Sequence, residues 1–451
     1  MVLPLGAPAQ GQNGQVLTID SCRTLALQHN KRLKAAAQGT LQAEYTRRST
    51  RALFLPDFSL RAYGLYDTSQ GSYTIDPNRL LQAYGPQLTA LATAAGLSLP
   101  PIQLPTYDLK YSTGWTFTGG AVMKQPIYLG GKLQAAYALS RTAVEMARQN
   151  ERLTEADVLM RTDEAFAQVV KAEEMVEVAQ RYCTLLAELE KNVESAVRHG
   201  LRLENDRLKV VVKHNEALLQ LRRAENAVRL ARMNLCHMTG LPLIASPSVE
   251  HRYPEVPEAL TQPTADVSQR PEAALLDGQA QLAAQQVRMA RSGLLPEVAL
   301  LAKYGYTRGL ELNDRILLDG WGFTGGVSVS VPLYHFGERT NKVKAAEAKR
   351  QQALLEREEK MNLMALELAQ AANHLDEARL EAELATQALA QAEQSLHLSA
   401  QQHDAGFETL SDYMASQALW QQAYGQQIEA RFRLYLAGVA YRKAAGQLSR
   451  P

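Results

Sequence analysis

The chain contains a long internal repeat, and this repeat limits its fold more than any other feature. The segment GWTFTGG at 114–120 returns as GWGFTGG at 320–326, and two of the three tryptophans of the chain lie in these copies. Sliding the sequence by the same 206 positions also aligns Gly200 with Gly406. A period this long indicates that one whole structural unit has been duplicated.

We divide the chain according to this repeat. Residues 16–240 form the expected first structural repeat and residues 271–446 the second. A proline-rich linker at 241–270 lies between them in the sequence, and we expect it near the middle of the helical part, as an equatorial linker. Residues 1–15 are interpreted as a flexible N-terminus, in which Ala7-Pro8-Ala9 resembles the end of a removed export signal.

Each repeat is expected to contain a β-hairpin, at 57–128 in the first and at 297–334 in the second. Apolar residues alternate with small polar ones in both hairpins, which is typical of a barrel strand that turns one face to lipid. A water-soluble sandwich shows the same alternation, so this pattern alone leaves both possibilities open. The first hairpin is longer than the second, and we expect a long loop at 67–113 between its strands.

The alternation assigns side chains to the two faces of these strands. We expect the apolar face to contact lipid through Trp115, Phe117, Trp321, Phe323, Val327, Val329 and Val331. We expect the polar face to line a lumen through Ser59, Arg61, Thr116, Thr118, Lys303, Thr324, Ser328 and Ser330. The two tryptophans would then anchor the strands at the membrane interface.

Very long helices follow the hairpins and decide against a sandwich. Apolar and alanine residues recur at a spacing of three and four over 132–198 and 338–403, a pattern typical of close-packed coiled-coil helices. At 1.5 Å per residue each helix would be about 100 Å long, which is too long for a globular domain.

Shorter helices complete each repeat. Return helices are expected at 203–238 and 409–445, and further helices at 20–53 and 271–294, so that two short helices match the length of one long helix. The fold class is therefore mainly α with a small β part. We expect long antiparallel coiled-coil helices that form an α-barrel, together with four strands per chain.

One copy of this chain would be incomplete in a membrane. No run of 18 apolar residues occurs, so no transmembrane helix is predicted, but short alternating strands can still cross a membrane as a barrel. Four strands that face lipid would leave two unpaired edges, which hydrocarbon does not tolerate. Three copies would give a 12-stranded transmembrane β-barrel with room for a lumen.

The composition argues against several function classes. The 48 basic and 47 acidic residues nearly cancel, so no nucleic acid is expected as a partner. Cys22, Cys183 and Cys236 are spaced too widely for a zinc site, and we interpret them as buried apolar residues. No metal site and no cofactor are predicted. The usual motifs of phosphate loops, serine hydrolases and zinc proteases do not occur, so the chain is not expected to be an enzyme and no catalytic residue is predicted.

The order of these elements resembles the outer-membrane efflux protein family of TolC-type channel-tunnels. Helix, proline, strand hairpin, Pro-x-Tyr turn (126–128 and 332–334), very long helix, glycine turn and return helix all occur twice. The segments LTIDSCRTLALQHNKRLKAAA and RPEAALLDGQAQLAAQQVRMARSGLLPEV are similar to the helices that usually open the two halves of that family. The resemblance covers about residues 16–446.

This resemblance implies a homotrimer in the cell outer membrane, with an α-helical tunnel that extends into the periplasm. It implies that the trimer is the exit duct of a tripartite efflux or type I secretion system. The expected partners are outer-membrane lipid, a periplasmic adaptor (membrane fusion) protein and an inner-membrane pump of the resistance-nodulation-division or ABC type. Substrates would pass through the duct passively, because the pump supplies the energy.

The resemblance also implies roles for the two glycine turns, the periplasmic tips. Residues at the tips would close the tunnel and dock the adaptor, and the matching positions are Arg198, His199, Gly200, Leu201, Ala405, Gly406 and Phe407. Asp206 and Asp412 would form the periplasmic gate, with three copies of Asp412 as a carboxylate ring. An acid that complements the helix dipole would explain the same two residues. The Tyr and Arg that hold the second tip in well-known members are replaced by His403 and Glu408, so the resemblance does not imply that particular latch here.

Two other functions compete with the duct. The first is a soluble periplasmic structural coiled-coil protein in which the strands form a cap, and it differs from the duct in having a wetted apolar face. The second is a periplasmic adaptor, which has a similar helical hairpin. An adaptor would not show the duplication and would need a lipoyl-like β domain, for which we find no pattern.

Overall fold

The computed structural model describes residues 16–98, 100, 103–254, 256 and 267–448. The expected flexible N-terminus at 1–15 lies outside the described residues, as do residues 255 and 257–266 of the expected linker.

The chain divides into two compact units. The helical unit comprises Met1–Thr46, Leu139–Ala284 and Ala348–Pro451, and the sheet unit comprises Arg47–Ala138 and Gln285–Glu347. Each unit therefore contains segments of both sequence repeats.

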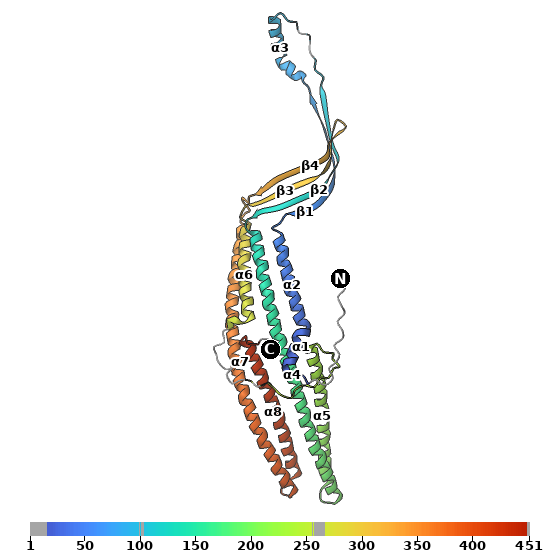
Figure 1. Ribbon diagram of the computed structural model, residues 1–451, viewed down its shortest axis with the longest axis vertical. Helices are drawn as coiled ribbons and strands as arrows, with labels where there is room; N and C mark the ends of the chain where they lie inside the picture. The colour runs from blue at the N-terminus through green and yellow to red at the C-terminus, as the bar shows by residue number, and fades with distance from the viewer. Residues whose placement is uncertain (1–15, 99, 101–102, 255, 257–266, 449–451) are drawn as a thin grey trace. The chain divides into compact units, whose positions relative to one another are not determined.

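The sheet unit is built on one antiparallel sheet with the strand order β1-β2-β3-β4 (Figure 1). The strands are β1 (Asp57–Ile75), β2 (Tyr107–Leu129), β3 (Glu297–Leu312) and β4 (Arg315–Ser330). The hairpins of the two repeats are thus joined through β2 and β3 into a single sheet. Within the described chain, β1 and β4 are the two edge strands.

The two hairpins approach each other closely where Gly120 of β2 pairs with Gly305 of β3. A Cβ atom added to Gly120 would lie 2.4 Å from the Cα atom of Gly305, a distance that real Cβ atoms do not show. Glycine is therefore required here because the two backbones leave no room for a side chain.

The first hairpin corrects one sequence expectation. Residues 67–113 are not a loop, because β1 continues to Ile75, β2 begins at Tyr107, and helix α3 (Asn78–Ala94) lies between them. The register with β2 shifts between Asp67 and Gln70, so the alternation of apolar and polar residues is interrupted there. For this reason the sequence pattern did not reveal that the strand continues. The Asp76 side chain accepts a hydrogen bond from the amide of Asn78 at 3.0 Å, which satisfies a backbone donor at the start of α3.

A second correction concerns the Pro-x-Tyr segment expected as a turn. Pro126-Ile127-Tyr128 lies inside β2, which ends at Leu129. Pro126 cannot donate a backbone hydrogen bond to the sheet, and the register shifts between Pro126 and Tyr128. The equivalent segment of the second repeat follows the end of β4 at Ser330.

Two antiparallel helical hairpins dominate the helical unit (Figure 1). The first consists of α4 (Lys132–Arg198) and α5 (Glu204–Thr239), and the second of α7 (Glu338–Asp404) and α8 (Leu410–Ala444). One apolar cluster draws on all four helices through Leu186, Val210, Ala392 and Trp420. The hairpins therefore pack on each other through the seam that the spacing of three and four predicts.

The helix expected at 20–53 is interrupted, which is a third correction. It consists of α1 (Ile19–His29) and α2 (Lys31–Ala52), separated by Asn30 in an extended conformation. The Asn30 side chain accepts a hydrogen bond from the amide of Arg32 at 2.9 Å and donates one to the carbonyl of Met238 at 3.3 Å. The break thus binds the end of α1 to the end of α5.

The remaining helices are α6 (Pro271–Ser292) and the short 3-10 helix η2 (Val267–Gln269). None of the helices in the described residues has a stretch that is both apolar enough and long enough to cross a membrane.

Candidate functional site

The first candidate tip is the turn between α4 (Lys132–Arg198) and α5 (Glu204–Thr239). Gly200 has a φ of +70°, and the amide of Leu201 donates a hydrogen bond to the carbonyl of Ala196 at 2.8 Å. This is a glycine-terminated helix end, which needs the left-handed backbone that glycine adopts readily. Arg198 and His199 are exposed, and the side chain of Leu201 is 78% exposed.

The second tip, between α7 and α8, has the same geometry. Gly406 has a φ of +79°, and the amide of Phe407 donates to the carbonyl of Gln402 at 2.8 Å. Ala405 is exposed, and Phe407 is 88% exposed. Each tip therefore presents one large apolar side chain to solvent beside its glycine.

The two candidate gate carboxylates have different surroundings. The Asp412 side chain accepts a hydrogen bond from the Thr409 hydroxyl at 2.6 Å, while the Asp412 amide donates to that hydroxyl at 3.2 Å. Asp412 thus takes part in the cap of α8 and complements its dipole. Asp206 lies in the first turn of α5, 3.7 Å from the ammonium group of Lys209. Asp412 is exposed, whereas Asp206 is partly buried.

A contact between the tips was not foreseen from the sequence. The Arg202 guanidinium lies 3.1 Å from Nε2 of His403. Because a guanidinium can only donate, Nε2 must accept, so the ring proton is on Nδ1. Nδ1 lies 3.3 Å from the carbonyl of Glu408, and the ring stacks on Tyr413 with centroids 4.9 Å apart.

These contacts explain how the second tip is held without the usual Tyr and Arg. The Glu408 carboxylate accepts a hydrogen bond from the Ser399 hydroxyl at 2.6 Å, which ties the turn back to α7. His403 fastens the turn to the first tip through Arg202. The sequence offered only one signal for this arrangement, namely the replaced residues at 403 and 408.

The sheet separates its side chains into an apolar and a polar face. The register pairs Trp321 with Tyr306 and Phe323 with Tyr304, and the ring centroids of Tyr304 and Trp321 are 5.5 Å apart. Trp115 packs against Tyr66 and stacks on Phe117 at 5.2 and 5.6 Å in the same way. Phe323, Val327 and Val329 follow the same alternation and stay exposed, while Val331 lies one residue beyond β4.

The polar face carries the side chains predicted to line a lumen. Lys303 donates a hydrogen bond to Thr118, and Thr118 lies 3.1 Å from the hydroxyl of Thr307. Lys303 also lies over the ring of Tyr63, 5.8 Å from its centroid. Arg61 is two positions before Tyr63 in β1 and therefore points to the same side of the sheet.

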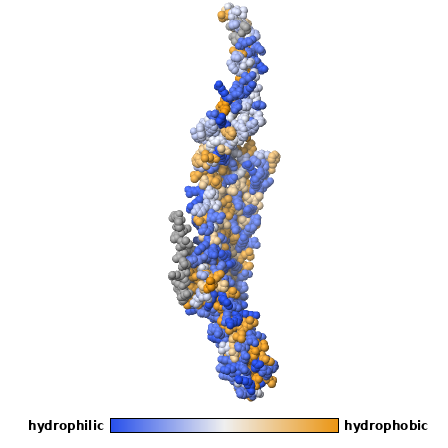
Figure 2. Space-filling view, turned by 90° about the vertical axis from the view of Figure 1, so that its right-hand side faces the viewer, coloured by the Kyte–Doolittle hydropathy of each residue, from blue (hydrophilic) through white to orange (hydrophobic). Residues whose placement is uncertain are grey.

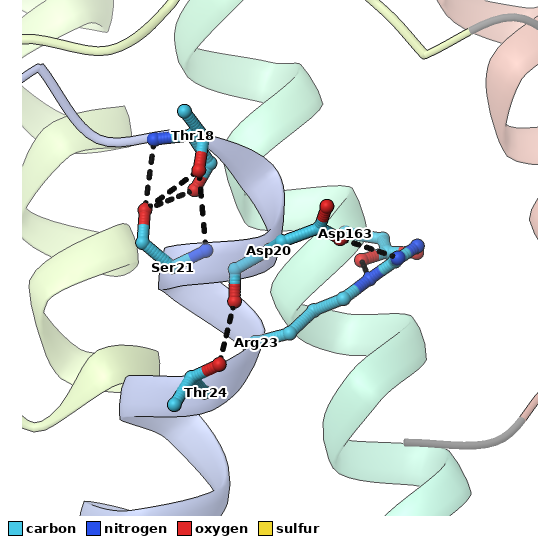
Figure 3. Close-up of polar contacts among 6 residues, drawn as sticks. All are labelled: Thr18, Asp20, Ser21, Arg23, Thr24 and Asp163. Carbon is cyan, nitrogen blue, oxygen red and sulfur yellow. Dashed lines mark hydrogen bonds and ion pairs between the residues drawn. The ribbon is translucent and has the colours of Figure 1, made fainter. Parts of the chain in front are cut away.

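A buried ion pair fastens α1 to α4 (Figure 3). Arg23 donates two hydrogen bonds to the carboxylate of Asp163, at 2.7 and 2.6 Å. The Asp163 side chain is 0% exposed and that of Arg23 is 15% exposed. The two bonds raise the pKa of Arg23 above its usual range. Sequence reasoning missed this pair, whose only signal is an acid inside the apolar run of α4.

Asp163 also affects the groups packed around it. Burial raises the pKa of the Cys22 thiol to about 12, and the nearby charge of Asp163 adds to this effect. Burial and Asp163 likewise raise the pKa of the Tyr435 hydroxyl. Both groups therefore stay protonated and unreactive, which suits a structural joint. In the described part of the chain, no three His, Cys, Asp or Glu side chains converge to hold a metal ion.

Comparisons with known proteins agree with this architecture. The family model described as outer membrane efflux protein matches residues 23–241 and 270–447. The chain belongs to the outer membrane efflux protein family. Comparison with curated proteins by sequence found no match.

Several solved structures share the fold of this efflux protein. The CmeC outer membrane channel of Campylobacter jejuni is 17% identical with a TM-score of 0.77, covering 95% of this chain and 85% of CmeC. The outer membrane protein VceC of Vibrio cholerae is 18% identical with a TM-score of 0.74, covering 95% of this chain and 96% of VceC. The MtrE outer membrane channel of Neisseria gonorrhoeae, solved in its open state, is 14% identical with a TM-score of 0.68, covering 96% and 90%.

Family membership confirms the expected resemblance, and the shared fold confirms the fold class of long helices with a strand contribution. Family membership also confirms the expected location of this efflux protein in the outer membrane. The roles of the tip, gate and lipid-facing residues remain predictions.

Proposed function

We propose that three copies of this efflux protein form an exit duct across the outer membrane. The observation that carries the proposal is the sheet, whose aromatic and valine side chains are exposed on one face while both of its edge strands are unpaired within the described chain. Lipid does not tolerate an unpaired strand edge, so the edges must meet those of other copies. Two copies would fill the interior with side chains, whereas three leave a lumen.

The helical hairpins give independent support for association. Figure 2 shows hydrophobic side chains on one face of the helical unit. Exposed leucines also occur on α5 and on α7. Leu219 and Leu230 of α5 and Leu363, Leu366 and Leu380 of α7 are each more than half exposed. Leucine rows of this kind on coiled-coil helices pack against further helices. In a trimer they would contact neighbouring copies and close an α-helical tunnel.

The tips are the proposed contact with the inner-membrane part of the system. We propose that Arg198, His199, Gly200 and Leu201 of the first tip, with Ala405, Gly406 and Phe407 of the second, dock a periplasmic adaptor protein. The exposed Leu201 and Phe407 support this role, because exposed apolar anchors are typical of binding surfaces. An inner-membrane pump of the resistance-nodulation-division or ABC type would then drive substrate into the duct, which conducts passively.

Asp206 and Asp412 are the proposed gate at the periplasmic entrance. Three copies of the exposed Asp412 around one axis would form a carboxylate ring that attracts cations. The contact between Arg202 and His403 would hold the two tips of each copy together around this ring.

The native mass of the protein extracted in detergent from outer-membrane fractions tests the duct. A trimer has three times the 49.8 kDa mass of the chain. Recovery of that mass supports the duct. A monomer or dimer in the soluble fraction would instead support the soluble coiled-coil protein and contradict the barrel.

A further inference from the structure

One cross-strand row on the polar face of the sheet contains a single side chain. The register aligns Arg61 of β1 with Gly120, Gly305 and Gly322 of the next three strands. Gly120 and Gly305 exclude any side chain because their backbones are in close contact. The Arg61 guanidinium is therefore the only side-chain group at this level of the sheet. Arg61 is exposed and makes no hydrogen bond or ion pair with another described residue.

A second unpaired cation lies in the neighbouring row. Lys303 pairs in register with Val122, and Val122 is two residues from Gly120 on the same face. The Lys303 ammonium contacts the Thr118 hydroxyl and the ring of Tyr63, and no ion pair joins it to an acid of the described chain. Its charge is thus held in place by neutral groups and is not cancelled.

The acids of the polar face lie away from these two cations. Asp57 pairs in register with Lys124, and Glu297 is the first residue of β3, so both lie toward the end of the sheet where β1 and β3 begin. Asp67 follows Arg61 by six residues in β1 and accepts a hydrogen bond from Ser69. Glu311 follows Lys303 by eight residues in β3 and accepts a hydrogen bond from Ser112. The rows of Arg61 and Lys303 and the row of Thr118 beyond them contain no acid.

We infer that Arg61 and Lys303 form a cation belt inside the barrel, which makes small organic anions the favoured cargo of this efflux protein. The inference rests on the proposed trimer, in which each cation occurs three times around the lumen. Rings of arginine and lysine favour anions in pores, and a narrow lumen with low-dielectric walls strengthens their field. The belt acts in the barrel, whereas the proposed Asp412 gate acts at the helical tips.

A cysteine placed next to the belt can report its potential directly. Val122→Cys lies beside Lys303 in its row and diagonally from Arg61, while the native cysteines Cys22, Cys183 and Cys236 are buried. The purified detergent-solubilised variant is treated at low ionic strength with two methanethiosulfonate reagents, one bearing a sulfonate and one a trimethylammonium group. The rate at which each reagent modifies Val122→Cys is divided by its rate with free cysteine. The result is the ratio of this normalised rate for the anionic reagent to that for the cationic reagent, called the anion-to-cation ratio.

The belt predicts a ratio well above one. A unit charge about 6 Å away in water changes the local concentration of a monovalent ion about threefold, and the two reagents respond oppositely. Lys303→Gln or Arg61→Gln should therefore each lower the ratio about tenfold, whereas Lys303→Arg and the uncharged substitution Ser328→Gln should preserve it. High salt should reduce it. As a control, the same ratio measured on a Phe407→Cys variant, whose cysteine lies at the tip, should not change when Lys303→Gln is added.

The native mass of each variant separates the two proposals. A trimer whose ratio is close to one, or unchanged by Lys303→Gln and Arg61→Gln, would overturn the belt and leave the duct intact. Failure of the unsubstituted protein to form a trimer would refute the duct and remove the lumen on which the belt depends. A trimer whose ratio falls as stated supports both.

Discussion

The buried pair of Arg23 and Asp163 allows the sharpest test of how the helical unit is held together. We consider three variants, Arg23→Met, Asp163→Leu and the combination of both. Each single variant leaves one charge of the pair without its partner. The double variant replaces the pair by two apolar side chains.

The two single variants should lower the free energy of unfolding by different amounts. Breaking a buried pair costs about 3–5 kcal/mol, because the remaining charge is left without compensation. Arg23→Met should lie at the upper end, since the Asp163 carboxylate is 0% exposed. Asp163→Leu should lie at the lower end, because Arg23 is 15% exposed and can still pair with Asp20, whose carboxylate is 3.2 Å away.

The double variant should recover most of the loss, since buried pairs are often replaced by apolar groups with little or no net cost. The free energy of unfolding is followed by far-ultraviolet circular dichroism in urea, with the protein in detergent micelles and at one fixed concentration. A strongly favourable coupling energy between the two substitutions is expected.

Two results would refute this reasoning. If each single variant lowers the free energy of unfolding by less than about 1 kcal/mol, the pair behaves like a solvent-exposed ion pair, which means that the site is open to water. If the cost of the double variant equals the sum of the single costs, the two side chains act independently and do not fasten α1 to α4.

Three further predictions concern the sheet and the entrance. Val329→Arg, on the apolar face, should weaken trimer assembly, because an arginine that faces lipid near the bilayer midplane costs about 2–4 kcal/mol. Ser328→Arg, on the polar face, should not weaken it. Equal yields of native trimer from the two variants would contradict the lipid-facing assignment. Gly120→Ala should destabilise the sheet by about 1–3 kcal/mol because its new Cβ has no room, while Gly322→Ala meets nothing within 4 Å; equal melting temperatures of the two trimers would disprove the close approach. Asp412→Asn should weaken block of single-channel current by divalent cations added from the periplasmic side, and unchanged block would argue for a capping role alone.

The local patterns of the chain predicted its elements well. The helices α4, Lys132–Arg198, and α7, Glu338–Asp404, agree with the expected 132–198 and 338–403, because a spacing of three and four persists along both. The faces of the strands followed from alternation, which depends only on neighbouring residues. Where the local signal was irregular, the expectation failed, as at Asp67 and Asn30.

Contacts between distant residues could not be predicted in this way. Arg202 and His403 are 201 positions apart, and Arg23 and Asp163 are 140 apart. Each of these side chains also suits a solvated helix face, so residue type alone gives no partner. The sequence predicted that the tip around Gly406 lacks the usual latch, and only the fold shows that Arg202 contacts His403 there.

By itself, the sequence determined the duplication, the element order, the length of the coiled coils and the two faces of the sheet. Those properties arise from periodicities that span a few residues and repeat. The tertiary structure alone decided that the two hairpins join through β2 and β3, that three glycines stand in register with Arg61, and that Arg23 closes on a buried Asp163. These arrangements depend on register and packing between distant segments, where a shift of one residue would place a different side chain in every contact.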